Sequence, residues 1–221
     1  MGPRLRWEVG RHFHREGLHL RHNGLTYRNT KEHTATPESE PGVGADADDY
    51  WDVHTFFNVV DVLDNFAEEY PQWADQGFEI AGYAWWQGHW DQGNARTAGR
   101  YEQNLVQLIE QMRKYYESRY PDNIITNAPF VLATIGFDGW DMDGDTLTVA
   151  DAQLAVDGDT GNYQQFDGNV RTIESRHYWR SSDVSPTSTG YHYNHNAETY
   201  LLTGDALGRA MIDMLEQEKE R

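Results

Sequence analysis

Helical and strand-like patterns alternate along most of this chain, and this alternation is the strongest constraint on its fold. Apolar runs of strand length separate stretches in which apolar residues recur at three- and four-residue steps. The strand-like runs are residues 78–86, 129–137 and 170–175, and the helical stretches are residues 56–70, 101–116, 147–154 and 196–215. Strands that alternate with crossover helices form parallel sheets. The sequence therefore predicts an α/β fold with a parallel sheet.

Several residues mark the expected ends of these helices. Pro71 and Pro121 follow the first two helical stretches, where proline prevents continuation. Asp145 is the expected N-cap of the third helix, and Asn196 that of the last.

The expected sheet is thin, because sheets usually contain about five or six strands. We therefore expect a fold that is truncated on its N-terminal side. The beginning of the chain could add a strand at Leu5–Val9 or Leu18–Leu20.

The first part of the chain differs from the rest in charge. Residues 1–31 hold seven Arg or Lys against two Glu, whereas the whole chain has a net charge of −18. Residues 35–49 are rich in Pro, Gly and acidic side chains, a composition typical of a loop or linker. We predict a basic head and acidic linker over residues 1–49 and one domain over residues 50–221.

The acidic composition restricts the partners. With 36 acidic against 18 basic residues, the chain repels nucleic acid and anionic membranes. No run has the length of a membrane span or the pattern of a signal peptide. The absence of cysteine excludes disulfides, thiolate metal sites and a cysteine nucleophile. The acidic excess fits either ordinary solubility or adaptation to a salty habitat.

Polar residues follow the first strand-like run directly, in the sequence Trp-Trp-Gln-Gly-His-Trp-Asp at residues 85–91. The carboxyl edge of an α/β sheet is where such folds hold reactive groups. Gln87 can contribute an amide N–H, Gly88 permits close backbone approach, and Asp91 can anchor a loop or a substrate hydroxyl. Alternatively, Gln87 and Asp91 only tie down a turn, and the tryptophans belong to the core.

A second polar turn lies just before the last helix and contains His192 and His195. His195 is a candidate general base, or else an ordinary hydrogen-bonding loop residue. No Glu or third His follows at the spacing of a zinc site, so we predict no metal there. The acidic loop 138–145 lacks the bidentate Glu of a calcium loop and is better explained as a solvated loop.

These turns resemble two sequence blocks of the SGNH-type carbohydrate esterases, in the sialate O-acetylesterase-like (SASA) branch. Residues 85–91 are similar to the block in which a strand ends in Trp-x-Gln-Gly, and residues 101–105 to the helix start that follows. His195 to Tyr200, followed by Gly-Asp-Ala-Leu at 204–207, is similar to the final block, whose His activates a serine. The likeness covers roughly residues 50–215.

The resemblance implies a three-layer α/β/α sandwich of the SGNH/flavodoxin-like kind and the removal of acyl groups from sugars without a cofactor. It implies that His195 is the general base and that Gln87 contributes to the oxyanion hole. Gly88, Trp90 and Asp91 would lie on the substrate side, with Trp90 suited to stacking on a sugar. The family also implies a secreted or periplasmic protein.

The chain departs from the family pattern in important ways. The block that bears the serine nucleophile is not found, His192 stands where the base usually has its Asp partner, and His89 replaces the acidic residue after Gln-Gly. The serines outside any such nucleophile turn are Ser39, Ser118, Ser175, Ser181, Ser182, Ser185 and Ser188. We therefore expect a partial esterase domain that is inactive or nearly so by itself. The alternative is a non-catalytic carbohydrate-binding or scaffold domain.

Overall fold

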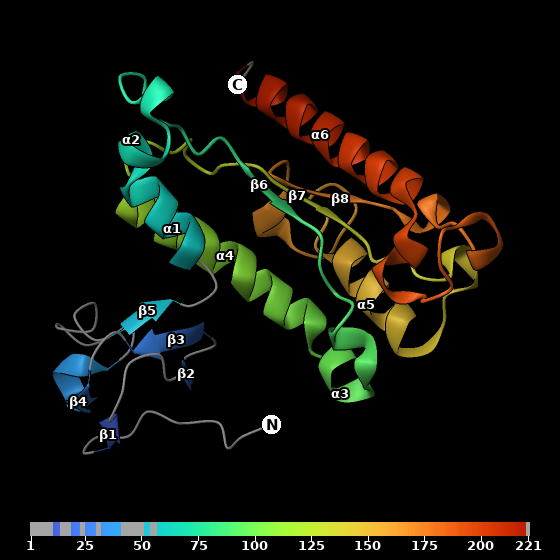
Figure 1. The fold of residues 1–221 in the computed structure, drawn as a ribbon, viewed down its shortest axis with the longest axis horizontal. Helices are drawn as coiled ribbons and strands as arrows, with labels where there is room; N and C mark the ends of the chain where they lie inside the picture. Colours follow the sequence, from blue (N-terminus) through green and yellow to red (C-terminus); the bar gives the residue numbers. More distant parts are fainter. Residues whose placement is uncertain are drawn as a thin grey trace. The chain divides into compact units, whose positions relative to one another are not determined.

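The computed structural model describes the backbone of residues 11–13, 19–22, 25–29, 32–40, 51–53 and 57–219 (Figure 1). The chain divides into two compact units, residues 1–78 and 79–221. The boundary between residues 49 and 50, predicted from composition, lies inside the first unit.

The first unit contains short antiparallel strands. Their bounds are β1 (His12–Phe13), β2 (His19–His22), β3 (Leu25–Asn29), β4 (His33–Thr34) and β5 (Trp51–Val53). Strand β1 pairs with β4, and β3 lies between β2 and β5. The strand expected at Leu18–Leu20 overlaps β2. Strand β2 belongs to this antiparallel sheet, so the prediction that it adds to the parallel sheet is wrong. Leu5–Val9 lies outside the described residues.

Short helices complete the first unit. They are η1 (Pro37–Ser39), α1 (Phe57–Asp64), α2 (Phe66–Glu69) and η4 (Pro71–Trp73). The single helix predicted up to Tyr70 is interrupted at Asn65, whose side-chain amide donates to the carbonyl of Asp61 at 2.8 Å. Asparagine competes for backbone hydrogen bonds in this way, which explains the break. Pro71 occupies the start of η4, as its fixed φ allows.

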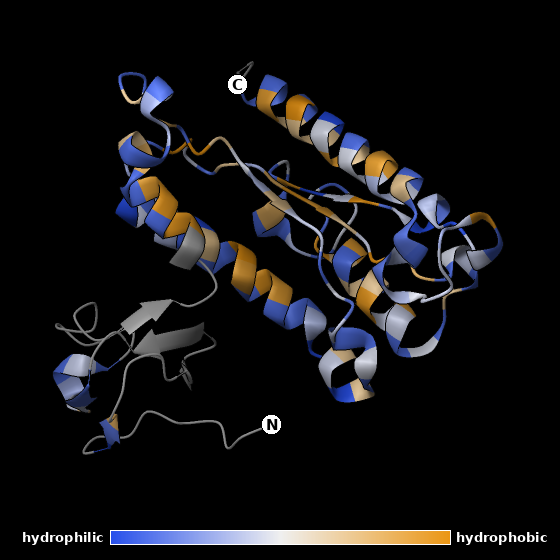
Figure 2. Ribbon diagram, in the orientation of Figure 1, coloured by the Kyte–Doolittle hydropathy of each residue, from blue (hydrophilic) through white to orange (hydrophobic). Residues whose placement is uncertain are grey.

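The second unit contains the predicted parallel sheet, in the order β6 (Tyr83–Trp85), β7 (Phe130–Ala133), β8 (Val170–Ile173). The prediction of an α/β fold with a parallel sheet is confirmed. Strand β6 is shorter than the apolar run, because Ile80 pairs with Ile124 only through an isolated bridge. All four residues of β7 are buried, and Figure 2 shows their apolar character.

Four α-helices accompany the sheet within the described part of this unit. They are α3 (Ala95–Ala98), α4 (Tyr101–Arg119), α5 (Gly144–Ala155) and α6 (Ala197–Lys219). The connections include six short 3-10 turns: η5 (Asp91–Gly93), η6 (Gly139–Asp141), η7 (Gln164–Phe166), η8 (Arg176–Tyr178), η9 (Ser182–Val184) and η10 (Tyr191–His195). Helix α5 begins at Gly144 with Asp143 as the capping position, so the predicted cap at Asp145 is wrong. Asp145 lies instead in the first turn, where a carboxylate favours the helix dipole.

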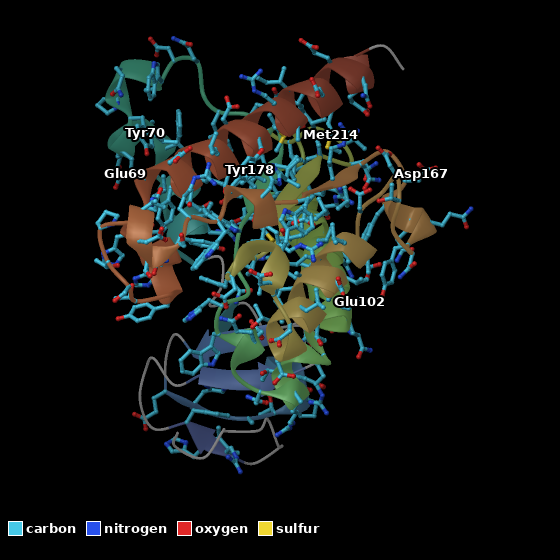
Figure 3. The ribbon with its side chains drawn as sticks, turned by 90° about the vertical axis from the view of Figure 1, so that its right-hand side faces the viewer. Glu69, Tyr70, Glu102, Asp167, Tyr178 and Met214 are labelled. Carbon is cyan, nitrogen blue, oxygen red and sulfur yellow. The ribbon has the colours of Figure 1, made fainter. Side chains whose placement is uncertain are left out.

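Helices lie on both faces of the parallel sheet (Figure 1). On one face, Val131 of β7 packs against Ala210 and Met214 of α6, the latter labelled in Figure 3. On the other face, the ring of Tyr83 lies 5.8 Å from that of Tyr116 in α4. Phe130 of β7 stacks on Tyr83 at 5.7 Å between ring centroids, so Phe130 and its neighbour Val131 face different helices, as the alternation of a strand requires. Within the described residues, no helix combines the length and apolarity that a membrane span needs.

Candidate functional site at the carboxyl edge of the sheet

The parallel strands bring three polar turns to one edge of the sheet. Residues 86–91 follow β6, residues 134–141 follow β7, and residues 174–180 follow β8. Helix α6 starts at the same edge, preceded by η10. The carboxyl edge is where open parallel sheets place their ligands.

Aromatic contacts join these turns. The ring of Tyr193 in η10 stacks on Trp86 at 4.7 Å and on Phe137 at 4.5 Å between ring centroids. The ring of His89 lies 6.1 Å from that of Tyr191. The turn before α6 therefore packs directly against the turns after β6 and β7.

Gln87 is held by several hydrogen bonds. Its side-chain amide donates to Asp91 Oδ2 at 2.8 Å, and its Oε1 accepts from the Tyr101 hydroxyl at 3.3 Å. Its backbone carbonyl accepts from the same hydroxyl and from Gln153 Nε2, both at 2.7 Å. An amide has two N–H donors, so one remains for a ligand after the bond to Asp91.

Gln153 and Tyr101 form a polar clamp beneath this turn. Gln153 is completely buried, and its Oε1 accepts from the Ile135 N–H at 2.7 Å. Its amide also donates to the Tyr101 hydroxyl at 3.1 Å. Burial raises the pKa of Tyr101 to about 12, so the phenol stays protonated and able to donate. The clamp ties together the ends of β6 and β7, and analysis of the sequence missed both residues.

Gly88 is required by its surroundings. Its φ is +152°, and a Cβ there would lie 2.8 Å from Ile135 Cγ2 and 2.9 Å from Val149 Cγ1. The backbone thus approaches other protein side chains closely at this residue.

The two tryptophans of this turn differ in exposure. Trp90 is 72% exposed, whereas Trp86 is half-buried and donates to the Thr134 carbonyl at 3.1 Å.

His192 and His195 are both exposed, and their rings stack at 5.8 Å with an interplanar angle of 22°. Because no hydrogen bond joins the rings of these two described residues, His192 does not reproduce the hydrogen bond of an Asp–His pair. Within the described residues, neither imidazole makes a hydrogen bond, and none joins Gln87 to His195.

The turn that carries these imidazoles is left-handed. His192, Tyr193, Asn194 and His195 have φ values of 54°, 50°, 52° and 56°. This conformation costs roughly 1–2 kcal/mol per L-residue. The sequence gives little warning of it, because only Asn among these residue types tolerates left-handed backbone readily.

Glu174 and Arg176 form an ion pair after β8. Arg176 Nε lies 2.9 Å and 3.0 Å from the two carboxylate oxygens of Glu174, and its guanidinium lies 4.7 Å from the centroid of Trp140. Burial alone would raise the pKa of Glu174, but the hydrogen bonds and charge of Arg176 outweigh burial and lower this pKa. This ion pair therefore lies in the turn that follows β8, at the carboxyl edge.

Three serines near this edge have other partners. Ser175 is 2% exposed, and its hydroxyl donates to the Thr134 carbonyl at 2.6 Å. Ser185 donates to the Arg180 carbonyl at 3.2 Å, and Ser181 to Asp183. None of these three hydroxyls donates to His195.

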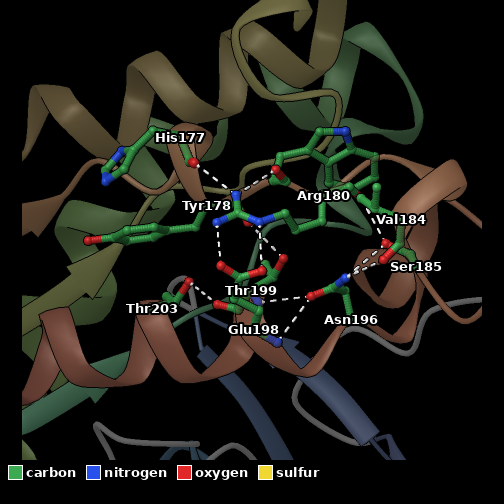
Figure 4. A network of polar contacts seen from close by, with 10 residues as sticks. His177, Tyr178, Arg180, Val184, Ser185, Asn196, Glu198, Thr199 and Thr203 are labelled. Atoms are coloured by element: carbon green, nitrogen blue, oxygen red, sulfur yellow. Dashed lines mark hydrogen bonds and ion pairs between the residues drawn. The ribbon is translucent and has the colours of Figure 1, made fainter.

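A polar network fixes the segment after β8 to the start of α6 (Figure 4). Arg180 makes two bonds to Glu198, at 2.8 Å and 2.9 Å. Asn196 Oδ1 accepts from the N–H groups of Glu198 and Thr199 at 3.0 Å and 3.3 Å. The predicted role of Asn196 as N-cap is therefore confirmed.

The described residues bring together no group of three or more His, Asp or Glu side chains suited to holding a metal. Comparisons of the chain with protein-family models, curated proteins and solved structures found no match.

Proposed function

We propose that residues 79–221 form an esterase-like domain of the sialate O-acetylesterase kind, which binds O-acylated sugars and, without the serine nucleophile of that family, hydrolyses them little or not at all by itself. The proposal depends on one observation. The ring of Tyr193 stacks on Trp86 and Phe137, so the turns that carry Gln87 and His195 share the carboxyl edge of the sheet. The resemblance of both turns to esterase blocks supports the same conclusion.

The fold proposed for this unit is a three-layer α/β/α sandwich of the SGNH kind. The parallel sheet, with α6 on one face and α4 on the other, supports this assignment. An edge with exposed aromatic and imidazole groups is a suitable place for a sugar ester.

In the proposed reaction, His195 takes the proton of a hydroxyl nucleophile that attacks the ester carbonyl. The N–H of Gln87 that is not bonded to Asp91 donates to the developing oxyanion. The sugar alcohol leaves with a proton, and water then releases the acid. In this reaction His195 is the proposed base and Gln87 the proposed oxyanion donor, and the nucleophile is the group for which no residue is proposed. Because Ser175, Ser181 and Ser185 are bonded elsewhere, none of them is proposed as the nucleophile.

The proposal is tested by measuring binding and hydrolysis separately. We expect calorimetry to detect binding of an O-acetylated sugar to the protein and to show weaker binding to the Trp90→Ala variant. Hydrolysis of p-nitrophenyl acetate should stay near the buffer rate. Strong hydrolysis that disappears in His195→Ala but survives in His177→Ala would show that the chain supplies its own nucleophile. Absence of binding to acetylated and free sugars alike would refute the proposed function.

A second candidate is a non-catalytic carbohydrate-binding domain. It is favoured by the bond between Gln87 and Asp91, which leaves the amide occupied in part, and by the 72% exposure of Trp90. This candidate predicts equal affinity for acetylated and free sugars. The esterase-like function predicts a preference for the acetylated form, so one titration series separates the two.

A further inference from the structure

The left-handed turn of η10 is the most strained backbone among the described residues. Its four consecutive residues from His192 to His195 all have positive φ, and none is glycine. Such strain persists only where the surrounding structure fixes it, and it is concentrated at functional sites.

The two middle residues of the turn hold it in place. Asn194 is 2% exposed, accepts from the Gly190 N–H at 2.8 Å through Oδ1, and donates to the Arg180 carbonyl at 3.1 Å. Its own carbonyl accepts from the Thr187 N–H at 3.2 Å. Tyr193 is 7% exposed, and its hydroxyl accepts from the Gly136 N–H at 3.4 Å. Asn194 thus bonds to three separate points of the loop, and Tyr193 fixes the turn to the sheet.

The two outer residues are the ones presented to solvent. In an extended segment, residues three apart point to opposite sides. The left-handed turn instead brings the rings of His192 and His195 together at 5.8 Å. The Tyr191 ring lies 4.9 Å from His192, and the Tyr200 hydroxyl donates to the His192 carbonyl at 3.0 Å. The burial of Tyr193 and Asn194 therefore fixes the positions of the His192 and His195 rings.

We infer that Asn194 is a positioning residue: by holding the left-handed turn, it sets where the His195 imidazole stands at the carboxyl edge. The inference rests on the proposed function only in taking His195 as the group that acts on substrate. Asn194 itself has no part in the chemistry. Asparagine suits the task, because it accepts left-handed backbone and carries both a donor and an acceptor.

The test follows the imidazole C–H resonances of the full chain by NMR, with His192→Gln and His195→Gln for assignment. Neighbouring rings displace these resonances from those of free histidine. We expect Asn194→Ala to lose this displacement for both histidines. Asn194→Asp retains the acceptor for Gly190 but loses the donor to the Arg180 carbonyl, so it should restore only part of the displacement. Asn94→Ala, which alters the cap of α3, should leave both resonances in place.

Resonances of His192 and His195 that stay unchanged in folded Asn194→Ala would overturn the inference. Should that variant fail to fold, Asn194→Gly decides the question, because glycine tolerates the positive φ but lacks the side-chain donor and acceptor. Resonances that stay unchanged in Asn194→Gly would also overturn the inference. Sugar binding measured on the same samples keeps the two ideas separate. If Asn194→Ala loses the displacement of the histidine resonances but the wild-type protein binds no sugar, the positioning role is upheld and the proposed function is rejected.

Discussion

Gln153 is completely buried at the carboxyl edge, yet its amide oxygen and nitrogen both have partners. It joins the Ile135 N–H to the Gln87 carbonyl and so holds two strand ends in register. A signal for this role was present in the sequence, because Gln153 lies three residues after Ala150 on the apolar stripe of its helix. Its partners could not be predicted, since they are far away in sequence and depend on how the strands pair.

Replacement of Gln153 by methionine tests this clamp. Gln153→Met keeps a side chain of similar length but leaves the buried Ile135 N–H without its acceptor. We expect the free energy of unfolding to fall by about 1–3 kcal/mol. Urea unfolding measures it, with Gln165→Met as the control at an exposed residue of the same type. Equal stability of the two variants would contradict the clamp.

Gly88→Ala is expected to destabilise the protein. The new methyl group would lie 2.8 Å from Ile135 Cγ2, on a backbone with a φ of +152°. Strain and overpacking together should lower the free energy of unfolding by roughly 2–4 kcal/mol. Gly93→Ala is the matched control, because nothing lies within 4 Å of its added Cβ. Thermal unfolding that is unchanged in Gly88→Ala would disprove the close approach.

Ionisation of Tyr101 makes the free energy of unfolding depend on pH in the alkaline range. Burial raises its pKa to about 12 from 10.0, so the folded protein favours the neutral phenol. The stabilisation that results from the raised pKa is fully present below pH 10 and is lost as the pH rises to 12. A pKa shift of this size corresponds to a free energy on the order of 3 kcal/mol. Unfolding experiments between pH 9 and pH 12 should show a shallower decline for Tyr101→Phe than for wild type. Parallel curves would show that Tyr101 is not responsible.

Among the elements, helix α6 depends on contacts at its first turn. Asn196 caps it, and the Arg180–Glu198 pair attaches the loop after β8 to the same turn. This start of the helix was predictable from Asn196, because the capping rule is local. The loop that precedes it was not, since its left-handed turn is stabilised by tertiary contacts of Tyr193 and Asn194.

Asn196→Ala should weaken the start of α6. The substitution leaves the N–H groups of Glu198 and Thr199 without their acceptor. A lost N-cap costs about 0.5–2 kcal/mol, and we expect a decrease in that range in denaturant unfolding. Asn196→Asp retains a capping oxygen but loses the amide donor to Ser185 and Val184, so its stability should lie between those of the alanine variant and wild type. An alanine variant as stable as the aspartate variant would exclude a capping role.

The parallel strands were the most predictable elements, because their apolar runs identify them locally. Their ends were less predictable. The run at 78–86 forms a ladder only at Tyr83–Trp85, since pairing depends on where β7 lies. The cap of α5 is Asp143 and not Asp145. Both residues are acidic and lie on either side of Gly144, so residue type alone did not distinguish them.

Across the whole molecule, the formal net charge of −18 is the dominant electrostatic feature. Like charges on one chain repel each other and destabilise the compact state. Salt shortens the screening length from about 10 Å at 0.1 M to about 3 Å at 1 M. We therefore expect the melting temperature to rise between these NaCl concentrations, even though exposed pairs such as Arg209–Asp205 weaken.

A variant with fewer charges separates this repulsion from other effects of salt. Glu216 and Glu218 are exposed near the end of α6, and Glu216→Gln with Glu218→Gln removes two negative charges there. The double variant should melt higher than wild type at 0.1 M NaCl, and the difference should shrink at 1 M. A gain of about 1 kcal/mol corresponds to about 2–4 °C for a chain of this size. A melting temperature that falls with salt would mean that the surface ion pairs contribute more than the repulsion among the carboxylates.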